Sequence, residues 1–335
     1  MSDAVVKQTL AIIIPAYKAD FLAKALASLV RQTDQRFNLY VCDDASPADI
    51  EGIARSSLGA RPWHFKRFET NLGGTSLARH LNRCVALAGE PWVWVFSDDD
   101  LLDDNCVAAF HKFLEADGET ADLLRFDAWI IDERDQITGL HTLHRDRETW
   151  LEFAYGLLMG WRRSFMQQLV FRRCAFELAG GFLDLPLGWS TDDAAVIAMG
   201  RQKPIRLIPG ARIRWRHSDK NITPDRSLAR REKTLQATCR FLEWLQGRLQ
   251  PPRELLFEND RAAFLRAMDR YLVEQIGIQG ARPALANWNL LARTRAAIGG
   301  GSRFALLKYI AVAAVADGLS AGGQAVRKLA GRSGQ

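Results

Sequence analysis

Short apolar runs that end in carboxylates constrain the fold of this 335-residue sequence more than any other feature. Residues 10–14, 38–42 and 92–96 are short apolar runs. The second run leads into the pair Asp43-Asp44, and the third leads into the triplet Asp98 to Asp100. The first run, LAIII, has no polar residue in alternation, which is typical of a strand buried on both faces. The sequence therefore predicts strands whose carboxyl ends carry clustered acidic side chains.

Segments with helical spacing separate these runs. Leu22, Leu26 and Leu29 recur at that spacing, and residues 75–88 and 105–115 show the same pattern. Strands that alternate with helices imply crossover connections and a mostly parallel sheet flanked by helices. Ligands of such sheets bind beyond the carboxyl ends of the strands, which is where the acidic residues occur.

The pattern changes twice after residue 120. Further strands are expected first, together with helices near 148–159 and 173–179. The expected additional strands are 63–68, 123–131, 166–172, 204–208 and 211–217. From residue 224 the chain is helical and rich in arginine, so we predict an α/β domain over 1–223 and a basic helical extension over 224–335.

Charge and cysteine content exclude several classes of protein. Residues 225–335 hold 18 Lys and Arg against nine Asp and Glu, so the first 224 residues carry −3 of the overall charge of +6. An acidic first part argues against a nucleic-acid partner. The five scattered cysteines include no CxxC pair, which disfavours disulfides and zinc and suits a reducing compartment. With no signal peptide and no spanning segment in the sequence, we expect a cytoplasmic protein.

The acidic triplet after residue 96 suits a hard divalent cation. Mg²⁺ and Mn²⁺ take oxygen ligands and commonly share one or two carboxylates with substrate phosphates. The alternative is a capping cluster in which Asp103 or Asp104 starts the next helix and the triplet is solvated. The acidic pair Asp43-Asp44 after a neighbouring strand favours the metal site.

Five segments in this order resemble glycosyltransferase family 2, whose members have the GT-A fold. They are IIIPAY, SLVRQT, VCDDASP, TNLGGTSLARHLN and VFSDDD, and the resemblance covers about residues 8–223. His80 stands where the family usually has Asn, and VFSDDD occupies the place of the family's DxD motif. The resemblance implies a metal-dependent inverting glycosyltransferase that moves a sugar from a nucleotide sugar, and we expect a UDP-sugar as the donor.

The resemblance also implies which residues bind the nucleotide and the Mn²⁺ or Mg²⁺ ion. Pro15, Ala16 and Tyr17 would line the nucleobase pocket, while Asp44, helped by Asp43, would bind the base or ribose. In the triplet, Asp98 and Asp100 align with the motif. We expect Asp100 to ligate the metal directly and Asp98 or Asp99 to bind the ribose or a metal-bound water. Arg79 is expected to reach the nucleotide, although an arginine on a helix is commonly just solvated.

Later segments supply the expected catalytic acid pair. The segment from Gly180 to Gly200 is similar to the family's stretch ending in Glu-Asp, but here the pair is Asp192-Asp193. The resemblance implies that Asp193 is the general base, within reach of the acceptor hydroxyl. Asp192 has the alternative role of capping the following helix.

The segment 212–223 resembles the family's late basic and aromatic stretch. His217 would then be a metal ligand and Arg216 would contact the diphosphate, against the alternative that both are structural. Trp161 and Trp189 could stack on sugars, but most of the ten tryptophans must belong to the core.

The end of the chain suggests a surface contact. Residues 275–335 hold eight basic residues and one acidic residue, and one helical face is expected to be apolar. The residues expected on that face are Phe304, Leu307, Ile310, Ala311 and Ala314. This face could lie on an anionic membrane surface at the inner face of the cell membrane. The alternative is an ordinary helix that packs on the catalytic domain or on a second copy of the chain. If this face binds the membrane, we expect the acceptor to be a lipid-linked glycan and the pathway to be bacterial cell-surface polysaccharide synthesis.

Two rival functions remain at this point. A sugar nucleotidyltransferase would need a Gly-rich basic loop after the first strand, and PAYKADF lacks one. A non-catalytic nucleotide- or glycan-binding subunit would not need the intact triplet and the pair Asp192-Asp193. A dehydrogenase is disfavoured because no GxGxxG occurs. The sequence leaves open whether a hexosyl or an N-acetylhexosaminyl group is transferred.

Overall fold

The computed structural model describes residues 9–218, 227–249, 258–300 and 305–317. These residues divide into two compact units. The first contains residues up to 184 and 191–222, and the second contains residues 185–190 together with those after 222. The sequence predicted a boundary at 223/224 but not that 185–190 would pack with the later helices. Residues 219–223 of the predicted basic and aromatic segment lie outside the described residues.

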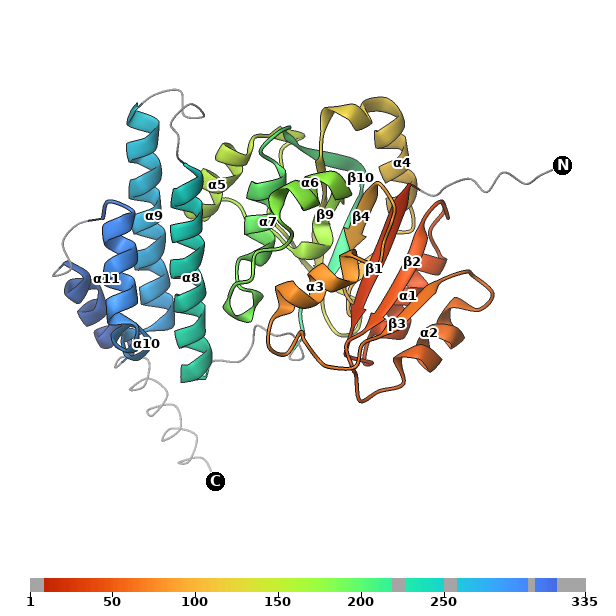
Figure 1. The fold of residues 1–335 in the computed structure, drawn as a ribbon, viewed down its shortest axis with the longest axis horizontal. Coiled ribbons are helices and arrows are strands. Elements are labelled where there is room, and N and C mark those ends of the chain that lie inside the picture. The colour runs from red at the N-terminus through yellow and green to blue at the C-terminus, as the bar shows by residue number, and fades with distance from the viewer. Residues whose placement is uncertain (1–8, 219–226, 250–257, 301–304, 318–335) are drawn as a thin grey trace, which may run out of the picture. The chain divides into compact units, whose positions relative to one another are not determined.

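A ten-stranded sheet forms the centre of the first unit, and its main order is β3-β2-β1-β4-β9-β6-β10-β5 (Figure 1). Its strands are β1 (Leu10–Ala16), β2 (Asn38–Asp43), β3 (His64–Arg67), β4 (Trp92–Val95), β5 (Leu101–Leu102), β6 (Leu123–Ile131), β7 (Ile137–Leu140), β8 (Arg147–Glu148), β9 (Leu169–Arg172) and β10 (Ile205–Arg216). The first four strands are parallel, as predicted, but β9 enters antiparallel between β4 and β6. The sheet as a whole is therefore mixed.

Helices cover both faces of this sheet. They are α1 (Leu22–Val30), α2 (Ile50–Leu58), α3 (Leu77–Val85), α4 (Cys106–Asp117), α5 (Trp150–Leu158), α6 (Arg173–Ala179) and α7 (Thr191–Met199). Leu10, Ile12 and Ile14 of β1 join the same buried core as α1, α2 and α4. The alternate side chains of β1 face the opposite way, and α3 contacts β1 and β4. The result is a three-layer α/β/α arrangement.

The strand register brings the carboxyl ends of several strands to one edge. Ala16 of β1 is opposite Asp43 of β2, and Ile13 is opposite Val95 of β4. β6 runs antiparallel to β9, which runs antiparallel to β4, so β6 is parallel to β4. β10 is parallel to β6, with Arg216 opposite Ile131. The loops after β1, β2, β4, β6 and β10 therefore lie along the same edge, as the sequence predicted for the first three.

The second unit is helical. It contains the short 3-10 helix η3 (Pro186–Gly188), α8 (Leu228–Arg248), α9 (Glu258–Gln279), α10 (Ala281–Ala286), α11 (Trp288–Ala297) and a helix over 305–317. α8 contacts η3, α9, α10 and α11. The buried side chains of this unit include Leu235 and Phe241 on α8 and Met268 on α9. None of the described helices is long and apolar enough to cross a membrane.

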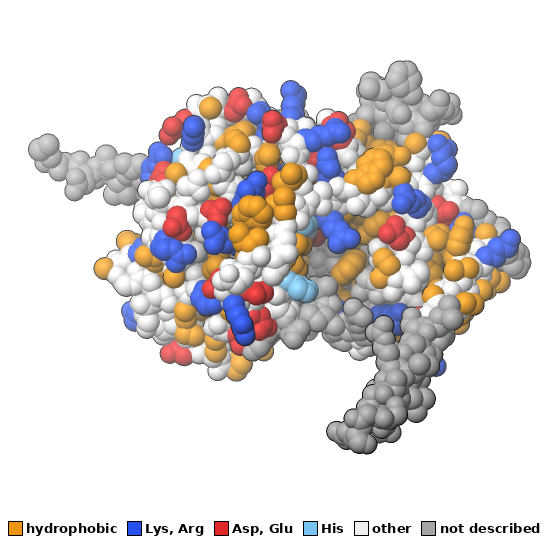
Figure 2. Space-filling model, turned by 180° about the vertical axis from the view of Figure 1, so that it is seen from behind, with side chains coloured by type: hydrophobic (Ala, Val, Ile, Leu, Met, Phe, Trp, Pro, Cys, Tyr) orange, Lys and Arg blue, Asp and Glu red, His pale blue; other side chains and the backbone are white. Residues whose placement is uncertain are grey.

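The helix over 305–317 exposes large apolar side chains on one side. Leu306, Ile310 and Ala313 are buried, whereas Leu307 and Val312 are 47% and 68% exposed. The apolar face predicted from the sequence is therefore divided, because Ile310 turns inward while Leu307 is exposed; Phe304 lies outside the described residues. On the surface drawn in Figure 2, basic and acidic side chains are interspersed with hydrophobic ones.

Candidate functional site

The first acidic residue of the triplet joins the loops after β1 and β4. Asp98 Oδ2 accepts hydrogen bonds from the main-chain amides of Tyr17 and Lys18, both at 2.9 Å. Burial and the neighbouring charge of Asp99 raise the pKa of Asp98 to about 6, against the opposing effect of these two amides. The Tyr17 side chain is 44% exposed next to this contact, whereas Ala16 is buried within β1 and Pro15 is half-buried. Of the three residues predicted to line a nucleobase pocket, Tyr17 is the most accessible.

The third acidic residue joins the triplet to the end of β10. Asp100 is 1% exposed, its Oδ2 accepts from Ser97 Oγ at 2.6 Å and its Oδ1 accepts from the amide of Arg216 at 2.6 Å. Burial, followed by the charge of Asp99, raises the pKa of Asp100 well above its usual value. This carboxylate is thus held between two strand ends in an environment that disfavours its negative charge.

The middle acidic residue is placed differently. The Asp99 carbonyl accepts from Arg216 Nε at 2.7 Å, but within the described part of the chain no hydrogen bond or ion pair uses the Asp99 carboxylate. Asp99 is half-buried. Among the three carboxylates, that of Asp99 is the one available for an external ligand.

Arg216 does not have the environment that was predicted for it. Its side chain is fully buried, its Nη1 donates to the Asp132 carbonyl at 2.7 Å and the guanidinium lies 4.2 Å from the Phe21 ring. Nη1 is also 2.6 Å from Asp135 Oδ1. A contact between this guanidinium and a diphosphate is not supported by this geometry, because the side chain is occupied by protein groups.

The carboxylates of the acidic pair after β2 accept hydrogen bonds from the amides of nearby loops. Asp43 is 1% exposed, accepts from the amide of Ser46 at 2.8 Å and forms an ion pair with Arg67. Asp44 is 2% exposed and accepts from the amides of Leu72 at 2.9 Å and Gly73 at 2.8 Å. In this structure both carboxylates face the protein interior, so they shape the loop around the predicted nucleotide site.

Two arginines that the sequence analysis did not select complete these acidic contacts. Arg67 pairs with Asp43, and Arg83 on α3 pairs with Asp44 while its guanidinium stacks 3.7 Å from the Phe68 ring. From its position in the sequence alone, Arg83 could not be distinguished from a solvated arginine on the surface of a helix. By contrast, Arg79, which was predicted to reach the nucleotide, is exposed on the first turn of α3.

His80, at the position where the family usually has Asn, is buried beside Asp44. Its Nδ1 accepts from Arg83 Nε at 3.1 Å and lies 3.2 Å from Asp44 Oδ1. Burial lowers the pKa of His80 to about 4, against the attraction of Asp44. The imidazole is therefore neutral at pH 7, and its contact with Asp44 is not a salt bridge.

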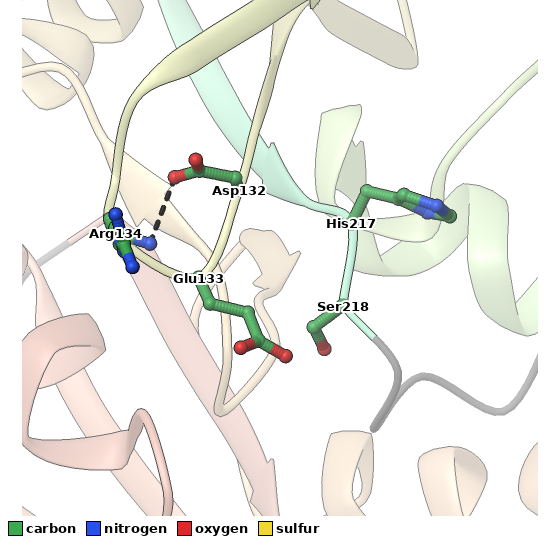
Figure 3. A pocket seen from close by; sticks show the side chains of 5 residues that line it. All are labelled: Asp132, Glu133, Arg134, His217 and Ser218. Atoms are coloured by element: carbon green, nitrogen blue, oxygen red, sulfur yellow. Dashed lines mark hydrogen bonds between the residues drawn. The ribbon is translucent and has the colours of Figure 1, made fainter. Parts of the chain in front are cut away.

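His217 lies in a pocket at the ends of β6 and β10. The pocket has a volume of about 300 Å³ and is lined by Asp132, Glu133, Arg134, His217 and Ser218 (Figure 3). Asp132 Oδ1 closes the turn by accepting from the amides of Arg134 at 2.8 Å and Gln136 at 2.9 Å. In Figure 3 the imidazole of His217 points away from Asp132. The pocket is therefore polar and of mixed charge.

The predicted metal ligands are not assembled in one cluster. Among the described residues, no group of three or more His, Cys, Asp or Glu side chains is placed to hold a metal ion. Asp98 faces the loop after β1 and Asp100 faces β10, so the structure does not bring Asp98, Asp100 and His217 together, and their role as metal ligands stays a prediction. The carboxylate chemistry nevertheless fits a hard cation, because Mg²⁺ and Mn²⁺ need only one or two carboxylates when phosphates complete the shell. The raised pKa values of Asp98 and Asp100 agree with a site that lacks positive charge.

The second acidic pair lies in a separate polar region. Asp192 and Asp193 occupy the first turn of α7, where Asp192 Oδ1 accepts from the amide of Asp193 at 3.0 Å. Burial raises the pKa of Asp192 to about 6, against the attraction of Arg125. Asp193 is 9% exposed and also interacts electrostatically with Arg125. The raised pKa of Asp192 shows that this region disfavours negative charge, and an acid with a pKa near neutrality is suited to proton transfer.

Arg125 is the centre of this region. It is 1% exposed on β6, and its Nη2 lies 3.3 Å from Ser164 Oγ. Burial lowers the pKa of Arg125 to about 10, while Glu148 and other acids oppose that effect. Nearby, Arg162 Nε donates to Glu148 Oε1 at 2.8 Å. This network was not predicted from the sequence, because the apolar run 123–131 indicates only a strand.

The two tryptophans proposed for sugar stacking differ in exposure. Trp161 is 58% exposed and lies edge-on to Tyr155, with 6.1 Å between the ring centroids. Trp189 is half-buried and belongs to the second unit. Trp161 is thus accessible to a ligand in this structure.

Comparisons with known proteins identify a family match over part of the chain and similar folds. Residues 11–169 match the glycosyl transferase family 2 model. The matched segment is somewhat less than half of the chain and contains the loops after β1, β2 and β4. It confirms the family resemblance for that segment. No curated protein matches the chain significantly.

Solved structures extend the agreement in fold. A structure of S. aureus TarS 1–349 in complex with UDP-GlcNAc has a TM-score of 0.67 at 14% identity, covering 87% of this chain and 81% of that one. TarS 1–349 in complex with UDP has a TM-score of 0.51 at 14% identity and covers 87% and 88%. A longer TarS structure, with a TM-score of 0.51 at 14% identity, covers 86% of this chain, which spans about half (52%) of that one. These similarities confirm the predicted GT-A fold class with a helical C-terminal region.

Proposed function

We propose that this chain is a metal-dependent inverting glycosyltransferase whose donor is a UDP-sugar. The observation that carries the proposal is the location of the family match: it contains the accessible Tyr17, the Asp43-Asp44 loop and the acidic triplet, which lie at one edge of the sheet. The complexes of TarS with UDP and UDP-GlcNAc support uridine as the base.

The transferred sugar is a hexosyl or N-acetylhexosaminyl group. Its acceptor is a hydroxyl of a glycan or of a lipid-linked glycan, in the synthesis of a bacterial cell-surface polysaccharide. The exposed Trp161 offers an aromatic face to a sugar.

The acidic triplet would hold Mn²⁺ or Mg²⁺ together with the donor diphosphate. Asp99 is the first candidate for the direct contact because its carboxylate is available, and Asp98 and Asp100 retain acceptor capacity beside it. A bound divalent cation would neutralise the leaving diphosphate. Asp43 and Asp44 act by shaping the nucleotide loop, and Tyr17 lies against the base.

Asp193 is proposed as the general base; α7 begins at Thr191, so Asp192 lies within its first turn and does not cap it as the sequence had predicted. Asp193 takes the proton from the acceptor hydroxyl as that oxygen forms a bond to the anomeric carbon. The bond from the anomeric carbon to the diphosphate oxygen breaks on the opposite face, so the configuration inverts and UDP leaves. Asp193 is buried beside Asp192, whose pKa burial raises to about 6.

A peripheral membrane contact is proposed for the second unit. The helix over 305–317 exposes Leu307, Val312 and Val315, and Lys308 is the charged residue among its exposed positions. Residues 275–335 carry eight basic residues against one acidic residue. An apolar face in a basic region suits the inner surface of an anionic membrane, and a second copy of the chain is the alternative occupant.

Calorimetric titration of UDP into the full chain, first with Mn²⁺ and then with EDTA, tests the proposal. We expect binding that requires the metal and is lost in Asp99→Asn. Asp100→Asn is the comparison that identifies the direct ligand, and Asp104→Asn, at an exposed carboxylate, is the matched control. Absence of UDP binding by the wild type with Mn²⁺ would contradict the proposal.

Turnover separates an enzyme from a binding subunit. With Mn²⁺ we expect slow hydrolysis of a UDP-sugar, which Asp193→Asn abolishes while UDP binding persists. UDP binding without any hydrolysis of UDP-hexoses or UDP-N-acetylhexosamines would instead favour the non-catalytic subunit.

A further inference from the structure

The buried Arg216, at the end of β10, connects two loops that are far apart in the sequence. Its Nε donates to the Asp99 carbonyl, its amide donates to Asp100 Oδ1 and its Nη1 donates to the Asp132 carbonyl, at 2.7, 2.6 and 2.7 Å. The same Nη1 lies 2.6 Å from Asp135 Oδ1. Arg216 thus ties the acidic triplet to the turn between β6 and β7.

Asp135 fixes Arg216 from the other side. Its carboxylate lies 2.7 Å from Lys24 Nζ on α1 as well as 2.6 Å from Arg216. Burial opposes ionisation of Asp135, but Lys24 and Arg216 outweigh it and lower its pKa. The carboxylate is therefore ionised at pH 7 and holds the guanidinium in one orientation.

The backbone of Asp135 indicates that this carboxylate is retained at a conformational cost. Asp135 has a φ of +65°, in the left-handed region that non-glycine residues adopt with strain, although Asp and Asn tolerate it best. Its amide donates to the Asp132 carbonyl at 3.1 Å, which closes the turn. Glycine would meet the backbone requirement more easily but would lose both ion pairs.

We propose that Asp135 and Arg216 form a positioning pair that fixes the main chain of Asp99 and Asp100 and thereby sets the affinity of the acidic triplet for a divalent cation. The metal part of this inference rests on the proposed function. Neither side chain touches the substrate, so both are positioning residues. Groups that orient metal ligands commonly change metal affinity by about 10- to 100-fold when they are removed.

Asp135→Asn is the decisive variant, because Asn tolerates the left-handed backbone and removes only the charge. We expect its apparent Kd for Mn²⁺, titrated in the presence of UDP, to rise about tenfold, while saturating Mn²⁺ restores UDP affinity. Arg216→Lys keeps the positive charge but loses the Nε contact to Asp99, and should give at least the same change. Arg31→Met, which removes an exposed ion pair with Asp104, is the control and should leave the Kd unchanged.

Amide hydrogen exchange in EDTA, without UDP, tests the positioning independently of the activity. Asp135→Asn should accelerate exchange at Leu101, Leu102 and the triplet while leaving β1 protected. An unchanged Kd for Mn²⁺ with unchanged exchange overturns the inference, as does a lower melting temperature accompanied by a wild-type Kd. If the wild type binds no UDP with Mn²⁺, the proposed function fails, and unchanged exchange in Asp135→Asn would then overturn the positioning as well.

Discussion

The amide nitrogen of Tyr17 lies 2.9 Å from Asp98 Oδ2, although 81 positions separate the two residues. This contact joins the loop after β1 to the loop after β4, and the amide of Lys18 reinforces it at the same distance. A change at the acidic triplet is therefore transmitted directly to the loop that carries the exposed Tyr17 ring.

Asp98→Asn should change how stability depends on pH. The pKa of Asp98 is raised to about 6 in the folded protein, above the usual value of about 3.9 for an unfolded chain. Protonation therefore favours the folded state, and the contribution of Asp98 to stability falls as pH rises through about 6. We expect Asp98→Asn in EDTA to melt at or above the wild-type temperature at pH 8, with the difference shrinking toward pH 5.

The reverse pH dependence is expected for metal binding, because the cation competes with protons for the triplet. The affinity for Mn²⁺ with UDP should fall as the pH is lowered from 7.5 to 5.5.

The melting experiment has its own contradicting outcome. A melting difference between Asp98→Asn and the wild type that stays constant from pH 5 to pH 8 would show that Asp98 does not titrate in this range.

Arg83→Met should destabilise the loop after β2. The substitution leaves the 2%-exposed Asp44 without its cationic partner, although the amides of Leu72 and Gly73 remain. We expect the free energy of unfolding to fall by about 2–3 kcal/mol in a urea titration. Arg55→Met removes an exposed pair with Glu51 on α2 and should change it by less than about 0.5 kcal/mol. Equal effects of the two substitutions would argue that the Asp44 pair adds nothing beyond a surface contact.

Gly181→Ala should disturb the contact between α3 and the segment before α7. Gly181 has a φ of +82°, and a Cβ there would lie 2.8 Å from Asn82 Oδ1, which accepts from the amide of Phe182. We expect a loss of about 1–3 kcal/mol in unfolding free energy from strain and the displaced Asn82. Gly180→Ala is the matched control, since it has a φ of +80° but open space, and should cost about 1 kcal/mol. Identical losses would mean that Asn82 moves away without cost.

Asp193→Asn and Asp192→Asn should separate the proposed base from its acidic neighbour in the first turn of α7. Loss of a general base lowers turnover by about 10²- to 10⁴-fold, so Asp193→Asn should reduce kcat by that factor with little change in donor KM. The side-chain oxygen of Asn can still accept from the amide of Asp193, so Asp192→Asn should have a much smaller effect on kcat. The two values of kcat, measured on the same UDP-sugar, decide the assignment, and a larger loss in Asp192→Asn would exchange the two roles.

Much of the sheet could be predicted from the sequence, because continuous apolar runs indicate buried strands. The predicted helix over 173–179 coincides with α6, and the expected strand over 123–131 coincides with β6. α2 was not predicted, although Ile50, Ala54 and Leu58 recur at helical spacing in this short segment. β5 and β8 are two residues long, too short for a sequence pattern. The antiparallel entry of β9 depends on long-range packing that no local pattern records.

The candidate site was predicted less completely. The acidic residues were found because several carboxylates follow strand ends, but their partners were not. A buried arginine such as Arg83 or Arg216 looks the same in sequence as a solvated one, since only the tertiary fold decides which carboxylate it meets. Asp135 was likewise indistinguishable from an ordinary turn residue.

The acidic strand ends after β2 and β4 differ in how their charge is balanced. Asp43 and Asp44 each have an arginine of their own, whereas the guanidinium of Arg216 is paired with Asp135 and the pKa values of Asp98 and Asp100 stay raised. A bare diphosphate approaching the triplet would meet uncompensated negative charge. The order of ligand addition follows from this imbalance: the nucleotide is expected to arrive as its metal complex, or after the cation, so the concentration of free metal would control how much of the donor is productively bound.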